Sequence, residues 1–429
     1  MKLRYILLAV VVSIFSIGCD SLITPEGEEG TGTEQGPSSD PEQDPEQDPE
    51  QNPEQKPEDI PDPQETGKFN IIAWSDITDN GDPSECEWKF EKLVEADFNM
   101  YLGWFDTAEK VEFVLSAADR VGIDIITSSP ELETDTENMV KKMTAHKSLY
   151  GYHIMDEPSE GHFPGLKTRI NEIRKYDSTR PCYVNLYPNW AWGGKIYYLA
   201  RVRKFVQEVP VSFLSFDNYP IKTVNGVSTV RDDWYHNLED IRTVAVENNM
   251  PIWAFALALS HSTDEASYPI PTIGELRLQQ FSNMLYGAVA FQYFTTWGFI
   301  QNHGVTNVYK NIQMVNAELC AFQKYFYGAD IKGIWHTGKT IPSGTKKLAT
   351  LPTGVTKLET EDSGALVTHF TKEGRDYIAV VNKNCNGGMD LFISFSDANA
   401  ALIGKDGTKT SVEEKYRIPA GDIRLFTWK

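Results

Sequence analysis

From Lys68 onward, short apolar runs alternate with helix-forming stretches, and this alternation limits the chain to a few folds. Eight apolar runs recur about 24 to 40 residues apart, and we expect strands at 69–74, 98–103, 124–128, 149–155, 182–186, 213–216, 252–257 and 288–294. Eight strands alternating with helices over about 260 residues are typical of a (β/α)8 TIM barrel of the α/β class. A doubly wound open sheet is the alternative, although no glycine-rich phosphate-binding loop follows the first strand.

Helix-boundary signals occur between the expected strands. Thr272 and Glu275 have the spacing of a capping box, and so do Ser84 and Glu87. An apolar stripe at 111–121 ends at Gly122, and glycine commonly terminates helices. These signals predict helices where a barrel requires them.

After residue 331 the pattern changes to short strands separated by turns. Alternating apolar residues at 366–370, 377–381, 391–395 and 423–428 flank glycine-containing turns, which predicts an antiparallel β-sandwich. We therefore expect a barrel domain at 68–331 and a C-terminal β-sandwich domain at 332–429. Packing against the barrel is the expected role of the second domain, and sugar binding is the weaker alternative.

The first nineteen residues have the features of an export signal. Lys2 and Arg4 precede an apolar stretch at 5–17, which is too short to span a bilayer core of about 30 Å. Residues 16–19, Ser-Ile-Gly-Cys, resemble the lipobox of bacterial lipoproteins, which implies that Cys19 carries lipid and becomes the mature N-terminus. An ordinary signal peptide with an incidental cysteine is the alternative. We expect an exported protein whose partner is a bacterial membrane, at the outer membrane or cell surface.

Residues 20–67 are expected to be a tether. Residues 20–65 hold sixteen acidic side chains, one basic side chain and nine prolines, and this composition cannot bury enough apolar surface to offset the entropy of ordering. The formal charge of the chain is −21, to which residues 1–19 contribute +2, residues 20–65 contribute −15 and residues 66–429 contribute −8. A mildly acidic body without a basic stripe argues against nucleic acid as a partner.

Aromatic and polar residues gather where the expected strands end, which is where the active site of a TIM barrel lies. These residues are Trp74, Asp76, Trp104, Asp106, Glu131, Glu133, Asp156, Glu157, Asn185, Tyr187, Asn189, Trp190, Trp192, Asp217, Tyr219, Ser260, His261 and Trp297. Aromatic rings match the C–H faces of sugars, while carboxyl, amide and phenol groups bind hydroxyls, so the mixture favours a carbohydrate. The residues selected for substrate binding are Trp74, Asp156, Asn185, Tyr187, Tyr219, His261 and Trp297.

The segment 151–158, Gly-Tyr-His-Ile-Met-Asp-Glu-Pro, is the sharpest local signal. A buried strand delivers Asp156 and Glu157 to the rim just before a proline. Glycosidic cleavage needs a carboxylic acid to protonate the leaving oxygen, and Glu157 has the position of such an acid. The alternative is that Glu157 caps the following helix or pairs with Lys or Arg.

Over residues 68–327 the sequence resembles the retaining barrel glycosidases of clan A, which include cellulases and β-galactosidases. The resemblance rests on Glu157 after the fourth strand, on Phe-Asp-Asn-Tyr-Pro at 216–220 and on Phe-Thr-Thr-Trp at 294–297. It implies that Glu157 is the general acid/base. Two positions depart from the clan: Asp156 replaces an asparagine, and 253–261 lacks the glutamate nucleophile that ends strand seven.

The second catalytic carboxyl group must therefore come from another strand. Asp217 is the first choice, Glu131 the second and Asp156 the third, while Asp217 could instead only hold a neighbouring backbone group or arginine in place. A separation of about 5 Å from Glu157 would indicate retention of configuration, and about 6.5 to 9.5 Å would indicate inversion.

The leading hypothesis is a glycoside hydrolase that cleaves O-glycosidic bonds of an oligo- or polysaccharide at the cell surface. The main rival is a non-catalytic carbohydrate-binding lipoprotein on a degenerate glycosidase barrel, and a structural or adhesive surface protein is third. No cofactor or metal is expected, because His153 and His162 have no ligand spacing to the acidic residues and belong to a core and a loop.

Replacing Cys19 with Ser tests the lipid anchor. Without the thiol no lipid can be attached, so the variant should leave the membrane fraction and appear in the soluble fraction on an immunoblot. Deleting residues 20–65 serves as the control, because it should keep the protein in the membrane fraction with an unchanged melting temperature. Membrane retention of the Cys19→Ser variant would contradict the anchor.

Overall fold

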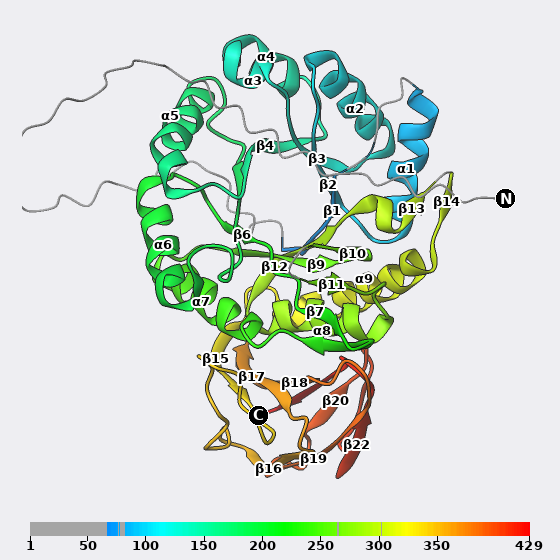
Figure 1. Cartoon of the computed structure of the whole chain (residues 1–429). Helices are drawn as coiled ribbons and strands as arrows, with labels where there is room; N and C mark the ends of the chain where they lie inside the picture. The colour runs from blue at the N-terminus through cyan, green and yellow to red at the C-terminus, as the bar shows by residue number, and fades with distance from the viewer. Residues whose placement is uncertain (1–66, 76, 78–81, 264–265, 302) are drawn as a thin grey trace, which may run out of the picture. The chain divides into compact units, whose positions relative to one another are not determined.

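The computed structural model describes residues 67–75, 77, 82–263, 266–301 and 303–429 (Figure 1). The expected export signal, Cys19 and the tether lie outside these residues. Among the residues described, no helix has both the length and the apolar composition needed to cross a bilayer.

Eight parallel strands close into a barrel, which confirms the predicted fold class (Figure 1). Their order around the barrel is β1-β12-β9-β6-β5-β4-β3-β2. They are β1 (Asn70–Trp74), β2 (Met100–Trp104), β3 (Asp124–Ser128), β4 (Leu149–Asp156), β5 (Cys182–Leu186), β6 (Leu214–Phe216), β9 (Ile252–Leu257) and β12 (Ala288–Phe294). Each predicted strand is present to within two residues, because a strand buried on both faces is a continuous apolar run.

Helices surround the barrel and cover its outer face (Figure 1). They are α1 (Pro83–Glu95), α2 (Ala108–Val121), α3 (Glu131–Thr134), α4 (Thr136–Thr144), α5 (Phe163–Arg174), α6 (Gly194–Glu208), α7 (Trp234–Glu247), α8 (Ile273–Leu285) and α9 (Asn307–Phe326). The capping box of Thr272 and Glu275 is confirmed at the start of α8, and Gly122 ends α2 in a left-handed conformation. The capping box expected at Ser84 is wrong, because the Asp82 side chain accepts from the Ser84 N–H and caps α1 instead.

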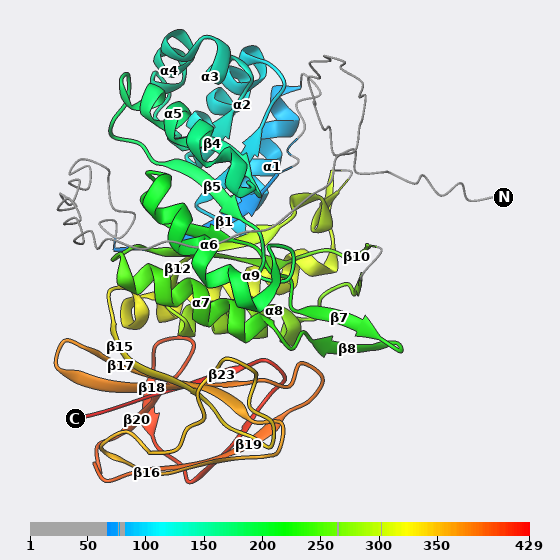
Figure 2. The same cartoon turned by 60° about the vertical axis from the view of Figure 1, so that its left-hand side comes forward.

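Short hairpins extend the loops at the C-terminal ends of the barrel strands. The longest, β7 (Ile221–Val224) and β8 (Val227–Val230), follows β6 and projects away from the barrel (Figure 2). The other two pairs are β10 (His261–Ser262) with β11 (Ser267–Tyr268), and β13 (Ile300–Gln301) with β14 (Gly304–Val305). These hairpins add surface beside the barrel mouth, where a site is expected.

The barrel interior is filled by side chains from most of its strands. The cluster comprises Ile72, Met100, Leu102, Ile126, Tyr183, Phe213, Trp253 and Ala290. The rings of Phe213 and Trp253 stack with centroids 3.9 Å apart and planes 5° apart. The interior is therefore a packed core that supports the residues above it.

The C-terminal region forms two antiparallel sheets that enclose a second apolar core, as a β-sandwich requires. The larger sheet has the order β15-β17-β18-β23-β20-β21 and the smaller one β16-β19-β22. The strands are β15 (Asp330–His336), β16 (Val355–Thr360), β17 (Ala365–Lys372), β18 (Arg375–Asn382), β19 (Met389–Phe395), β20 (Ala401–Ile403), β21 (Lys409–Ser411), β22 (Lys415–Ile418) and β23 (Ile423–Trp428).

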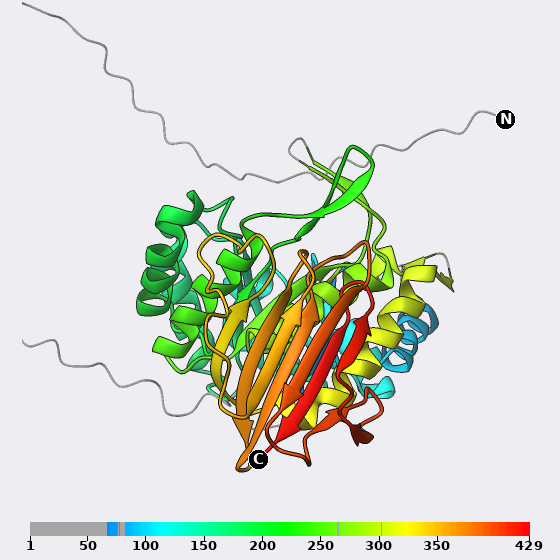
Figure 3. The ribbon, with the colours of Figure 1, turned by 90° about the horizontal axis from the view of Figure 1, so that it is seen from below.

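The outer face of the larger sheet packs on helices α8 and α9 (Figure 3). Phe326 of α9 and Phe370 of β17 have ring centroids 4.6 Å apart, and the Thr368 hydroxyl donates to the Leu285 carbonyl at 3.2 Å. This face belongs to the same hydrophobic cluster as the outer layer of the barrel. The second domain therefore supports the α8–α9 side of the barrel.

Replacing Trp253 with Ala should lower the free energy of unfolding by about 3–5 kcal/mol, because it opens a cavity in the barrel interior. Trp190→Ala is the matched control, since Trp190 is 37% exposed and stacks on the Arg231 guanidinium at 4.6 Å. The control should cost about 1 kcal/mol or less. Urea unfolding followed by circular dichroism measures both values, and equal losses would contradict the packed interior.

Candidate active site

Glu157 occupies a bend at the C-terminal end of β4. Its backbone φ is +48°, a left-handed conformation that a residue with a side chain rarely adopts. The Glu157 N–H donates to the Asn185 carbonyl at 2.9 Å, which holds the bend against β5. Such strain is concentrated at functional sites because the surrounding structure must maintain it.

Asp217 follows β6 and lies beside Glu157. The two side chains are within hydrogen-bonding reach, so a protonated Glu157 can donate to the Asp217 carboxylate. Tyr219, two residues further along, donates its hydroxyl to Asp217. The structure thus brings together Asp217 and Glu157, which are separated by sixty positions in the sequence.

Asn185 of β5 connects the carboxyl groups of the neighbouring strands. Its amide nitrogen donates to Asp156 Oδ1 at 3.1 Å and to Asp217 Oδ1 at 3.0 Å. A reversed amide would point its oxygen at both carboxylates, so only this orientation is stable. One amide group therefore uses both N–H donors to hold two acidic side chains.

A buried polar network inside the barrel fixes that orientation. The Ser215 hydroxyl donates to Asn185 Oδ1 at 2.9 Å and accepts from Gln292 Nε2, also at 2.9 Å. Tyr183 donates to Gln292 Oε1 at 2.9 Å, which orients the Gln292 amide in turn. The network runs from β12 to β5 and preorganises the site from below.

The pKa values of Asp156, Glu157 and Asp217 are all raised at the barrel mouth. Solvent reaches one side of Asp156, yet desolvation raises its pKa to about 6 against the lowering effect of Asn185. Desolvation and the charges of Asp217 and Asp156 raise the pKa of Glu157 the furthest. Desolvation and Asp156 also raise the pKa of Asp217, while its hydrogen bonds with Asn185 and Tyr219 lower it. Glu157 is therefore the carboxyl that keeps its proton at neutral pH.

Aromatic side chains lie at the C-terminal ends of the barrel strands. Trp297, after β12, is 45% exposed, and Tyr187 is half-buried near Glu157, whose charge raises the Tyr187 pKa after desolvation does. Trp74 is half-buried against Trp104, with ring centroids 5.3 Å apart. These exposed or half-exposed rings provide faces on which a sugar can stack.

Other predicted site residues lie in different surroundings. Glu131 opens α3, where hydrogen bonds with the Ser129 side chain and the Ala108 backbone lower its pKa, and no interaction with the three carboxyls is described. His261 stacks on Tyr268 at 4.5 Å and is half-buried, which lowers its pKa. Trp192 is 5% exposed and belongs to the hydrophobic core.

The seventh strand of the barrel, β9, ends without an acidic side chain at the described positions. Ala258 and Leu259 after β9 are buried, and Ser260 is exposed. Asp76, Asp264 and Glu265 lie outside the described residues. In the described part of the chain, no cluster of three or more His, Cys, Asp or Glu side chains could hold a metal ion.

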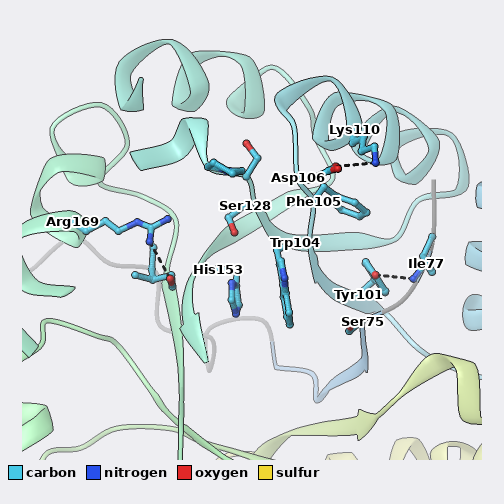
Figure 4. Close-up of a pocket in the computed structure, with 13 residues that line it drawn as sticks. Ser75, Ile77, Tyr101, Trp104, Phe105, Asp106, Lys110, Ser128, His153 and Arg169 are labelled. Atoms are coloured by element: carbon cyan, nitrogen blue, oxygen red, sulfur yellow. Dashed lines mark hydrogen bonds and ion pairs between the residues drawn. The ribbon is translucent and has the colours of Figure 1, made fainter. Parts of the chain in front are cut away.

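A cavity that the sequence did not predict opens at the C-terminal ends of β1 to β4. It has a volume of about 620 Å³ and is lined by His153 and Arg169 among others (Figure 4). His153 was expected in a core, and it is indeed 6% exposed, but it also borders this cavity. Arg169 comes from helix α5, and the strand pattern gives no signal for a helical residue that reaches the barrel mouth.

No protein-family model and no curated protein sequence matches the chain. Among solved structures, alpha-L-fucosidase isoenzyme 2 from Paenibacillus thiaminolyticus has a TM-score of 0.50 at 7% identity, covering 84% of this chain and 99% of that chain. Amy13B from Eubacterium rectale gives 0.48 at 7% identity, covering 85% and 96%. The endo-beta-1,4-mannanase from Thermotoga petrophila gives 0.42 at 10% identity, covering 82% and 98%. The likeness to the fucosidase shows a shared fold, and at this identity it carries over neither activity nor residue roles.

The raised carboxyl pKa values make stability depend on pH. The folded-state pKa of Glu157 lies above its ordinary value of 4.5, so the folded state binds more protons and stability falls as the pH rises above about 4.5. Glu157→Gln removes this proton uptake. The difference in melting temperature, variant minus wild type, should therefore be larger at pH 9 than at pH 5. The corresponding change in the free energy of unfolding is on the order of 1 kcal/mol or more.

The exposed Glu91 of helix α1 provides the matched control, because Glu91→Gln removes a carboxylate from the surface. Its melting temperature should follow that of wild type at both pH values in differential scanning calorimetry. A constant offset between Glu157→Gln and wild type across this range would show that Glu157 titrates as an ordinary carboxyl.

Proposed function

We propose that the chain is a glycoside hydrolase that cleaves O-glycosidic bonds of an oligo- or polysaccharide, with Glu157 as general acid. The observation that carries this proposal is the hydrogen-bonded pair of Glu157 and Asp217 at the barrel mouth. Glu157 keeps its proton at neutral pH, as an acid that protonates a leaving oxygen must. The rim also offers Trp297 and Tyr187 as aromatic faces for a sugar.

Asp217 acts mainly through Glu157. The two carboxyl groups are within hydrogen-bonding reach, which is closer than the separation across a scissile bond in retaining or inverting enzymes, about 5 to 9.5 Å. The Asp217 charge raises the pKa of Glu157 and accepts a hydrogen bond from its acid form. We therefore propose Asp217 as the positioning residue that keeps the acid protonated.

Among Asp217, Glu131 and Asp156, the residue best supported as the second catalytic carboxyl group is Asp156. It is open to solvent, and with a pKa of about 6 it is ionised at neutral pH. Such a carboxylate can stabilise the positive charge that develops on the sugar ring or activate a water. The Asn185 amide holds it in place without removing its charge.

A non-catalytic carbohydrate-binding protein on the same barrel is the second candidate. The observation that favours it is the end of β9, where the described residues 258–261 include no carboxylate. Binding without hydrolysis would then use the same aromatic rim. In either case we propose that the protein is exported and held at a bacterial membrane through Cys19 and the acidic, proline-rich segment 20–67.

Glu157→Gln should lower kcat by about 10²–10⁴-fold, because the amide keeps the shape but cannot donate the proton. The full chain is assayed against plant and host glycans with reducing-sugar detection. Glu91→Gln serves as the control and should retain the wild-type rate, because Glu91 is exposed on helix α1. A Glu157→Gln variant with wild-type turnover would refute the acid assignment.

Asp217→Asn tests the positioning role separately. Loss of its charge should lower the pKa of Glu157, so the alkaline limb of the kcat profile should move to lower pH. A profile that loses amplitude without moving would mean that Asp217 does not tune Glu157.

A further inference from the structure

The cavity bordered by His153 and Arg169 is formed at the C-terminal ends of the first four barrel strands (Figure 4). It is lined by Ser75, Ile77, Tyr101, Trp104, Phe105, Asp106, Lys110, Ser128, Ser129, Pro130, His153, Ile154 and Arg169. Its volume of about 620 Å³ lies within the range of small-ligand sites, roughly 300–1,000 Å³. The cavity can therefore hold a sugar.

The strand register places the cavity on the same strand as Glu157. Trp104 pairs with Ser128 across β2 and β3, and Thr127 pairs with Tyr152 across β3 and β4. Ser128 and His153, the next residues on their strands, are therefore level with each other. His153 is only four residues before Glu157, so one strand contributes to both the cavity and the acid.

Two buried nitrogen atoms at the cavity wall have no hydrogen-bond partner among the described residues. His153 Nε2 and Arg169 Nε are both buried without a hydrogen bond. Burial, and then the charge of Arg169, lower the pKa of His153 to about 3, which places the two side chains near each other and keeps the imidazole neutral. An unsatisfied buried polar group is costly, so such groups commonly mark a ligand.

Arg169 Nη1 donates to the Ile154 carbonyl at 3.2 Å, which leaves the other N–H groups of the guanidinium and its charge to be accounted for (Figure 4). Lys110 and Asp106 form an ion pair at 2.8 Å on the opposite side of the cavity (Figure 4). The carboxylate described near Arg169 is that of Glu133 at 3.5 Å, whose side chain is 68% exposed and does not line the cavity. A pair with one exposed partner is weak, so the remaining N–H groups of the guanidinium are available to an anion.

The cavity also has an aromatic wall. The Trp104 ring is 45% exposed and stacks on the His153 imidazole with centroids 4.7 Å apart. His153 therefore fixes the orientation of an indole that a sugar ring can contact. An aromatic wall combined with a charged fork of N–H donors suits a sugar that bears an anionic group.

We propose that this cavity is a subsite for an anionic sugar, in which Arg169 and His153 bind a carboxylate or sulfate group and Trp104 contacts the ring. The inference rests on the proposed function and names its substrate class, an acidic glycan. The anion is held on the β1–β4 side of the barrel mouth, away from the Asp156–Asp217 pair, because those carboxylates would repel it.

Isothermal titration of the full chain with three probes tests the proposal: methyl β-D-glucuronide, glucose 6-sulfate and methyl β-D-glucoside. Wild type should bind at least one anionic probe about 10-fold or more tightly than the neutral one, and the tighter of the two identifies carboxylate or sulfate as the source of the anion. Arg169→Gln should weaken that probe about 10- to 100-fold and leave the neutral probe unchanged. Arg169→Lys should recover part of the loss, because it restores charge without the planar fork.

Arg120→Gln is the matched control, since Arg120 pairs with Glu87 on the surface at 2.7 Å, and it should bind all probes like wild type. Equal binding of anionic and neutral probes, no binding of either anionic probe, or an unchanged Arg169→Gln variant would overturn the subsite. Binding needs no turnover, so these results are independent of the glycan hydrolysis assay. Hydrolysis of neutral glycans without anion preference would refute the subsite and leave the proposed function intact.

Discussion

The site depends most on the amide of Asn185. Strands β4 and β6, on either side of β5, bring Asp156, Glu157 and Asp217 to one edge of the barrel mouth, where their charges repel each other. The two N–H groups of Asn185 hold one oxygen of each aspartate, and the network through Ser215 prevents the amide from turning. The repulsion that remains is relieved by a proton on Glu157, so the packed interior of the barrel determines the protonation state of its mouth.

The sequence predicts the barrel well and the site in part, for separate physical reasons. Buried strands appear as apolar runs whatever their neighbours, so the eight barrel strands could be found from local pattern. Glu157 and Asp217 each follow such a run, which places both at the rim. Their direct contact depends on the left-handed bend at Glu157 and on strand register, which single-sequence patterns do not contain. Arg169 could not be found either, because only tertiary packing decides which side chain of helix α5 reaches the mouth.

The acidic groups and the cavity lie on different sides of the barrel mouth. The β4–β6 side gathers acidic groups that hold a proton, while the β1–β4 side offers a cavity with Arg169, His153 and an aromatic wall. His153 and Glu157 share strand β4, so a sugar bound in the cavity would lie next to the acid. The C-terminal sandwich packs on helices α8 and α9, and no described residue of these two helices lines the cavity.

The central claim is that Glu157 is a carboxylic acid at neutral pH. Infrared difference spectroscopy of wild type minus Glu157→Gln at pH 7 tests it without any substrate, because the C=O stretch of a protonated carboxyl is separate from carboxylate bands. The account predicts a carboxylic-acid band in the difference spectrum that disappears as the pH is raised well above neutrality. A difference spectrum at pH 7 that contains only carboxylate bands would contradict it.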